Sequence, residues 1–123
     1  MTDYKPADRE WRRISGEEAK TGDALPIPEF IVSYPEERYI DIYYQKPEKK
    51  NYNITGVILG YEIRDAPPKN QELFLHSVFS TRSPYRFAFA EEERGRIFYI
   101  AIRWLNRQGE LGPWSEIQRA VVP

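Results

Sequence analysis

The stretch from Arg96 to Val122 constrains the fold more than any other part of this 123-residue chain. Its first half alternates. Four side chains fall on one face of an extended chain, namely Phe98, Ile100, Ile102 and Trp104, and three fall on the other, namely Tyr99, Ala101 and Arg103. Asn, Gly and Pro residues follow at 106–113, and a second extended run is expected from Trp114 to Val122. This pattern predicts a β-hairpin with one buried face.

Short alternating runs also occupy the middle of the chain. Strands are expected at residues 30–33, 38–44, 56–64 and 84–89. The side chains expected to face inward are Ile40, Ile42, Tyr44, Val57, Leu59, Tyr61, Ile63, Tyr85, Phe87 and Phe89, whereas Tyr39, Asp41 and Tyr43 are expected to face outward. Residues 69–82 fit either a helical turn or a short edge strand. About seven short strands, with turns every 8–12 residues, predict an all-β antiparallel sandwich of the immunoglobulin-like class.

The first 28 residues differ from the rest. Residues 7–14 fit a short helical turn, and residues 24–28 form a connector that Pro26 and Pro28 stiffen. We therefore expect an N-terminal tail and Pro-containing linker at 1–28 and one β-sandwich domain at 29–123.

The composition sets limits on function. Lys and Arg number 18 against 19 Asp and Glu, so the chain lacks the basic surplus typical of nucleic-acid-binding proteins. No cysteine is present, and no apolar run reaches the ~20 residues of a membrane span. The first residues show no secretory signal, so a cytoplasmic location is the default if the chain is complete, although the compartment itself stays open.

Three patterns in residues 29–123 resemble the fibronectin type III family. They are Ile40-x-Ile42-x-Tyr44 followed by Pro47, Ile54-Thr55-Gly56 followed by Tyr61-Glu62-Ile63, and Asn106-x-x-Gly109 followed by Gly112-Pro113-Trp114-Ser115-Glu116. The resemblance implies a seven-stranded sandwich. One departure is Phe98, which stands where that family usually has an anchoring tyrosine.

The runs at residues 65–68, 80–87 and 94–116 are also similar to the C-terminal module of uncharacterised bacterial proteins, in which a helical region precedes such a domain. This second resemblance implies a fold and no activity.

Arg103 and Trp114 are the first candidate site. They are expected on neighbouring strands, where a guanidinium can stack on an indole ring. Cytokine-receptor modules of this fold stack Arg and Trp in this way, but a second Trp-Ser pair is missing here, since Glu116 and Ile117 follow. The alternative is that Trp114 only covers the end of the core and that Arg103 pairs with Glu62.

The outward tyrosines Tyr39, Tyr43 and Tyr99 are the second candidate site, as contacts for a protein partner or a glycan. Tyr39 and Tyr43 are expected on one sheet and Tyr99 on the other. The Glu91–Glu93 run is expected to be a charged turn and His76 an incidental histidine, because no nucleophile–base pair or metal-ligand spacing accompanies them.

We therefore expect a non-enzymatic module without metal or cofactor that acts as a protein-interaction or spacer domain. Its contact surfaces would be an exposed sheet edge and the aromatic loops, with the chain a monomer or a weak homodimer through a sheet edge. The alternative is a carbohydrate-binding module that uses Tyr39, Tyr43, Tyr99 or Trp114.

Overall fold

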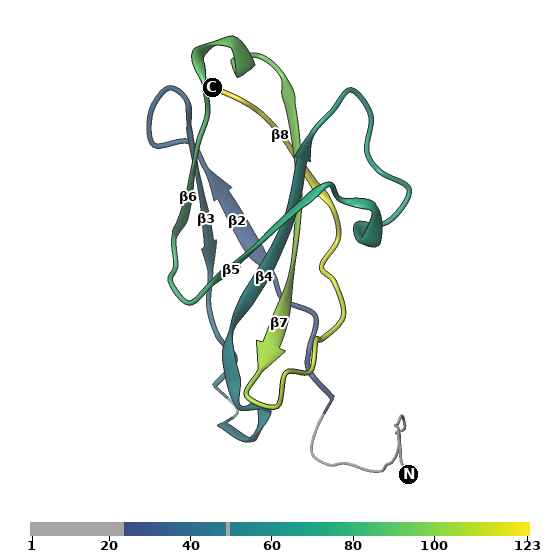
Figure 1. Ribbon diagram of the computed structural model, residues 1–123. Coiled ribbons are helices and arrows are strands. Elements are labelled where there is room, and N and C mark those ends of the chain that lie inside the picture. Colours follow the sequence, from purple (N-terminus) through teal and green to yellow (C-terminus); the bar gives the residue numbers. More distant parts are fainter. Residues whose placement is uncertain (1–23, 49) are drawn as a thin grey trace.

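The computed structural model describes residues 24–48 and 50–123, which form a sandwich of two antiparallel sheets (Figure 1). The seven strands of this part are β2 (Phe30–Ser33), β3 (Tyr39–Tyr44), β4 (Ile54–Ile63), β5 (His76–Ser80), β6 (Tyr85–Ala88), β7 (Ile97–Asn106) and β8 (Gln118–Val121). Three 3₁₀ turns lie between them: η1 (Lys50–Tyr52), η2 (Gln71–Leu73) and η3 (Glu91–Glu93). The prediction of an all-β antiparallel sandwich is confirmed.

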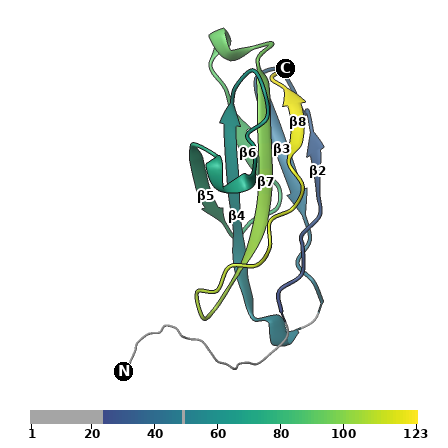
Figure 2. The ribbon, with the colours of Figure 1, turned by 90° about the vertical axis from the view of Figure 1, so that its right-hand side faces the viewer.

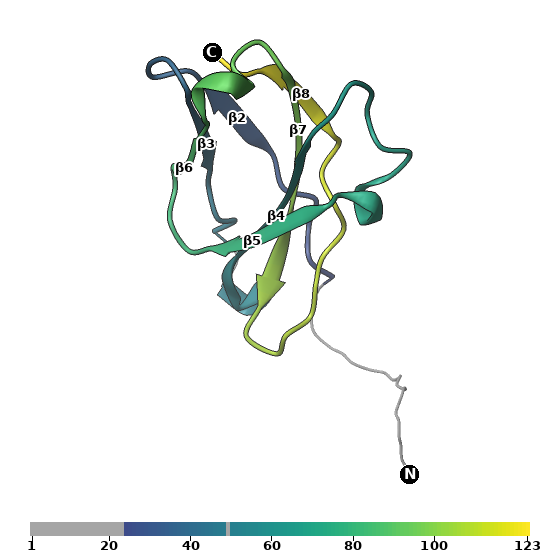
Figure 3. The ribbon, with the colours of Figure 1, turned by 45° about the horizontal axis from the view of Figure 1, so that its top comes forward.

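The strands divide into a three-stranded sheet, in the order β2-β3-β6, and a four-stranded sheet, in the order β5-β4-β7-β8. Figure 3 shows the two sheets as separate layers. Strands β4 and β7 are the longest and pair from Ile54↔Asn106 to Ile63↔Phe98, so they form the spine of the larger sheet (Figure 2). The Gln118 side-chain amide donates to the Phe30 carbonyl oxygen at 3.1 Å and ties β8 to β2 on one side of the sandwich.

The core lies between the sheets and contains the side chains that alternation places inward. The buried cluster comprises Phe30, Ile40, Ile42, Val57, Leu59, Phe87, Phe89, Phe98, Ile100, Ile102, Trp104, Ala120 and Val122. Tyr44, Tyr61, Ile63 and Tyr85 are partly buried against it. Most of these residues come from strands in which every second residue is apolar, and alternation identified them for that reason. Phe89 and Val122 follow directly after β6 and β8, and Phe30, Ala120 and Val122 were not among the side chains expected to face inward.

The final strand is shorter than expected, since β8 begins at Gln118 and not at Trp114. Residues 112–115 still follow β7, but irregularly. The Ser115 N–H donates to the Ile102 carbonyl oxygen at 2.8 Å, while the Ile102 N–H donates to the Ser115 hydroxyl at 2.9 Å. A side-chain oxygen thus replaces a backbone carbonyl, and Pro113 has no N–H to offer, so a regular ladder starts only three residues after Ser115.

Both alternatives for residues 69–82 occur, one after the other. Asn70 caps η2 by accepting a hydrogen bond from the Glu72 N–H at 2.9 Å. The chain then enters β5, which forms one edge of the four-stranded sheet. The sequence pattern of this segment was ambiguous because it contains two short elements, η2 and β5, whose side chains repeat with different periods.

Two outward-facing residues are buried, against expectation. Asp41 is only 3% exposed and Tyr99 only 4% exposed. Asp41 lies beneath the Arg86 guanidinium, which donates to its carboxylate from Nε at 2.8 Å and from Nη2 at 3.0 Å. The hydrogen bonds from Arg86 hold the pKa of Asp41 below its ordinary value.

The helical turn predicted at residues 7–14 lies outside the described residues. Within the predicted linker, Leu25 packs against the core and touches Gly112, where an added Cβ would lie 2.8 Å from the Leu25 Cβ. The boundary at residue 28 stays a prediction.

Candidate functional site

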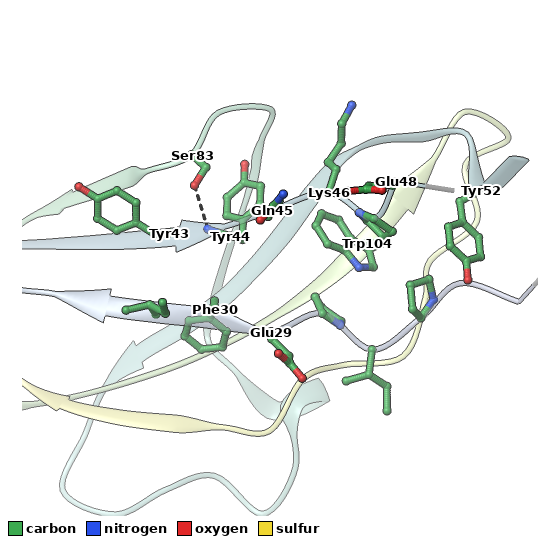
Figure 4. Close-up of a pocket in the computed structure, with 15 residues that line it drawn as sticks. Glu29, Phe30, Tyr43, Tyr44, Gln45, Lys46, Glu48, Tyr52, Ser83 and Trp104 are labelled. Atoms are coloured by element: carbon green, nitrogen blue, oxygen red, sulfur yellow. Dashed lines mark hydrogen bonds between the residues drawn. The ribbon is translucent and has the colours of Figure 1, made fainter. Parts of the chain in front are cut away.

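A groove opens where the pairing of β2 with β3 stops. The last paired residues are Phe30 and Tyr44. On the far side of Phe30 the two segments separate, and the chain there carries Pro28 and Pro26. The resulting groove has a volume of about 760 Å³. Residues 26–31 line one wall, residues 43–48 and Tyr52 line the other, and Ser83 and Trp104 complete it (Figure 4).

Tyr44 and Trp104 form the base of the groove. Their rings meet edge to face with centroids 5.9 Å apart. The Tyr44 hydroxyl donates to the Arg82 carbonyl oxygen at 2.6 Å and lies 3.2 Å from the Ser80 hydroxyl, while its backbone N–H donates to the Ser83 hydroxyl at 2.8 Å. Burial raises the pKa of the Tyr44 hydroxyl. These bonds fix the ring, so the base is rigid.

The indole nitrogen of Trp104 is unusual in this base. Trp104 is 1% exposed, and its Nε1 is the only buried side-chain polar atom without a hydrogen-bond partner within residues 24–48 and 50–123. The ring therefore gives the groove an apolar base whose N–H lies covered beneath the lining.

The rim of the groove carries exposed apolar groups beside charges. Tyr43 is 44% exposed and Ile31, its partner in the β2–β3 register, is 70% exposed. Glu29 and Glu48 stand on opposite walls, and no ion pair engages either of them in the described part of the chain. Lys46 also lines the groove, but its side chain extends away from Trp104 (Figure 4).

The predicted Arg103–Trp114 pair forms on the outer face of the four-stranded sheet. The guanidinium carbon lies 4.7 Å from the Trp114 ring centroid. Arg103 Nε donates to the Gly112 carbonyl oxygen at 2.8 Å, and the Trp114 Nε1 donates to Glu72 at 2.9 Å. The alternative partner Glu62 is not used by Arg103, whose nearest carboxylate is Glu72 at 3.5 Å.

This cluster fastens η2 onto the sheet. Glu72 accepts from both Arg103 and Trp114, and Gln71 donates to the Ser115 carbonyl oxygen at 2.8 Å. The cleft that remains between η2 and the sheet is about 230 Å³ in volume. The charged and polar groups of the cluster thus already bind one another.

The outward tyrosines do not converge. Tyr39 is half-buried, with the Arg86 guanidinium carbon 5.0 Å from its ring centroid. Tyr43 shares the outer face of β3 but lies at the groove, whereas the expectation that Tyr99 is exposed is wrong because it is buried on β7. Only Tyr43 among the predicted contact residues lines the groove.

The other candidates from the sequence are engaged in the fold. His76 stacks on Tyr61 with ring centroids 5.4 Å apart. Glu91 pairs with Arg94 at 2.9 Å and with Arg38 at 3.8 Å. Among the described residues, no three His, Cys, Asp or Glu side chains are grouped to hold a metal ion. No helix in that same part of the chain has the length and apolar character needed to cross a membrane.

Sequence reasoning did not predict the groove, whose other lining residues include Pro26, Pro28, Glu29, Glu48, Tyr52 and Trp104. The available signal was Pro26-x-Pro28, directly before a strand whose neighbour is rich in tyrosine.

Comparison with known proteins places the fold. No family model matches the sequence, and no curated protein matches it. Similar solved structures include a myokine, with a TM-score of 0.59, 13% identity, and coverage of 83% of this chain and 99% of that chain. The FN1–FN3 domains of chicken CNTN1 give 0.60 and 14% identity over 85% of this chain, and domains A168–A170 of titin give 0.56 and 14% over 86%.

This chain spans about a third of the latter two, 35% and 34% of their lengths. At such low identity the likeness concerns the fold alone. The chain folds as a sandwich of the fibronectin type III and immunoglobulin-like kind.

Proposed function

We propose that this chain is a non-enzymatic protein-interaction module and that the groove between residues 26–31 and 43–48 is its contact surface. The observation that carries the proposal is the rigid aromatic base of Tyr44 and Trp104, bordered by the exposed Tyr43 and Ile31. Protein interfaces combine such an apolar, aromatic centre with a polar rim. The fibronectin-like fold, which many interaction and spacer modules share, supports a role of this kind.

The groove also fits the energetics of recognition. Its base is held by hydrogen bonds within the domain, so a partner does not have to order it on binding. Tyr43 offers a large ring with few rotatable bonds, the type of side chain that often dominates binding energy. The Arg103–Trp114 cluster is less suited to binding a partner, because its charged and polar groups are already paired within the domain.

A display selection tests the proposal. A library of random twelve-residue peptides would be selected against the wild-type chain and against Tyr43→Glu, with Tyr34→Glu as the matched control. Tyr34 is 51% exposed and does not line the groove. We expect enriched peptides that bind the wild type and Tyr34→Glu but not Tyr43→Glu.

Two results would contradict the proposal. One is that no peptide is enriched, and the other is that the enriched peptides bind Tyr43→Glu as well as they bind the wild type. A glycan array run on the same three proteins addresses the carbohydrate-binding alternative: binding to sugars that Tyr43→Glu loses, without peptide enrichment, would replace a protein partner by a glycan.

A further inference from the structure

We infer that the occupant of the groove is an extended proline-containing segment that carries a basic residue, bound in the polyproline II conformation. This inference rests on the proposed function and names the chemistry of the partner at the same groove. Three observations carry it: the missing backbone donors of the walls, the rings and side-chain donors of the lining, and the charge of the rim.

The walls disfavour a partner that adds as a β-strand. Strand addition needs a row of backbone N–H and C=O groups, and the lining contains Pro26, Pro28 and Pro47, none of which has an N–H. A polyproline II segment makes no backbone ladder and is recognised through its rings and carbonyl oxygens. The prolines of the lining thus favour a ligand that needs no backbone ladder.

The lining supplies what such a segment needs. Proline rings pack into grooves formed by aromatic side chains, and Tyr43 and Tyr52 stand on the β3 side of the groove. Ligand carbonyl oxygens require donors from the protein. Tyr43 and Gln45 are among the lining residues, and no hydrogen bond within the described residues engages the hydroxyl of Tyr43 or the side-chain amide of Gln45.

The charge of the rim favours a cation on the ligand. Glu29 and Glu48 contribute two negative charges and Lys46 one positive charge, so the lining carries a net charge of −1. The two carboxylates have no ion-pair partner in the described part of the chain, whereas the Lys46 side chain extends away from Trp104 (Figure 4). An Arg or Lys on the segment therefore meets unpaired carboxylates at the mouth of the groove.

The test is a nuclear magnetic resonance titration with a defined probe. The probe is the terminally blocked peptide Arg-Pro-Pro-Leu-Pro-Pro-Leu-Pro, added to the ¹⁵N-labelled full chain up to about 1 mM. A dissociation constant of about 1 mM corresponds to about 4 kcal/mol of binding free energy. We expect the signals of residues 29–31 and 43–48 and the indole N–H of Trp104 to shift, while those of β5 and Trp114 stay in place.

Two comparison peptides and two variants define the specificity. Replacing every proline of the probe by alanine should abolish the shifts, and replacing its arginine by glutamate should weaken binding about fivefold. Tyr43→Ala should weaken binding of the probe about tenfold. The double change Glu29→Gln and Glu48→Gln should remove the preference for the arginine peptide over the glutamate peptide. Glu116 carries an exposed carboxylate outside the groove, so Glu116→Gln should leave this preference unchanged.

Each outcome decides the inference. Equal shifts with the alanine peptide would overturn the polyproline assignment while leaving the groove as an interaction surface. Absence of shifts at the groove, or shifts confined to β5, would also overturn it, and the display selection would then judge the proposed function independently. Loss of the arginine preference in Glu116→Gln would overturn the charge argument.

Discussion

Replacing Trp104 separates two contributions to the free energy of unfolding, namely the packing of its ring and the hydrogen bonding of its N–H. Its ring is 1% exposed and its N–H has no partner in the described part of the chain, a situation that usually costs about 1–3 kcal/mol. Trp104→Ala should lower the free energy of unfolding by about 3–5 kcal/mol, because a large cavity forms. Trp104→Phe should cost less than half as much, since it keeps an aromatic ring and removes the unpaired donor.

Urea denaturation of the three proteins measures both effects. Equal losses for the phenylalanine and alanine variants would show that the indole N–H is satisfied in solution. A loss below about 1 kcal/mol for Trp104→Ala would contradict the burial of the ring.

Asp41 should link the stability of the domain to pH. Its pKa is held below the ordinary value of 3.8 in the folded chain by hydrogen bonds from Arg86. A lowered folded pKa stabilises the fold above the unfolded pKa, and this contribution disappears as the pH falls below about 3.8 toward the folded value. Asp41→Asn should therefore be less stable than the wild type at pH 7.

Chemical denaturation at pH 7 and pH 3 checks this linkage. The difference between the wild type and Asp41→Asn should shrink at pH 3, where the Asp41 carboxyl of the unfolded chain is largely protonated. A difference of the same size at both pH values would assign the stabilisation to something other than the ion pair.

Two glycines of β4 show how an element fits its neighbours. An added Cβ at Gly56 would lie 2.5 Å from the Ser80 carbonyl oxygen, a backbone atom of the paired strand β5. At Gly60 the nearest atoms are ring carbons of Phe74 and Trp114, both at 3.0 Å. We expect Gly56→Ala to lose about 1–3 kcal/mol of stability and Gly60→Ala to lose less, because rings on the outer face can move and a strand backbone cannot.

Thermal unfolding of the two alanine variants compares them directly. The lower midpoint should belong to Gly56→Ala. The reverse order would show that the Trp114 cluster is as immobile as the β4–β5 ladder.

The alternation of inward and outward side chains was enough to predict β3, β4, β6 and β7. Each of these strands has one apolar face and keeps the two-residue period of an extended chain. Alternation failed for β8, where Ser115 substitutes its hydroxyl for a backbone carbonyl and delays the ladder. It also failed for Tyr99 and Asp41, since a sequence pattern gives the face of a strand but not what covers that face.

The candidate site was predicted only in part. Arg103 and Trp114 meet as expected because their segments lie side by side, and Tyr43 does line an open surface. The groove itself was not predicted. It depends on residues 26–31 and residues 43–48 separating in space, which follows from the long-range pairing of β2 with β3 and not from either segment alone.

At the scale of the molecule, the two sheets share a single core. The buried cluster takes side chains from both sheets, so separating the sheets would expose the core side chains of both. We expect one cooperative unfolding transition, with the same urea midpoint by far-ultraviolet circular dichroism and by tryptophan fluorescence. The test applies within each protein: in Trp104→Phe or in Trp114→Phe, a fluorescence midpoint that differs from the circular-dichroism midpoint of the same variant would contradict a shared core.

Residue 24 lies at one end of the sandwich and residue 123 at the other (Figure 1). Strands β2 and β8, which lie next to these two residues in the sequence, run along the same long direction (Figure 2). A stretching force applied at residues 24 and 123 therefore acts parallel to the β2–β3 and β7–β8 ladders. Their hydrogen bonds bear the load together in shear rather than peeling apart one at a time, which is the geometry that resists mechanical extension.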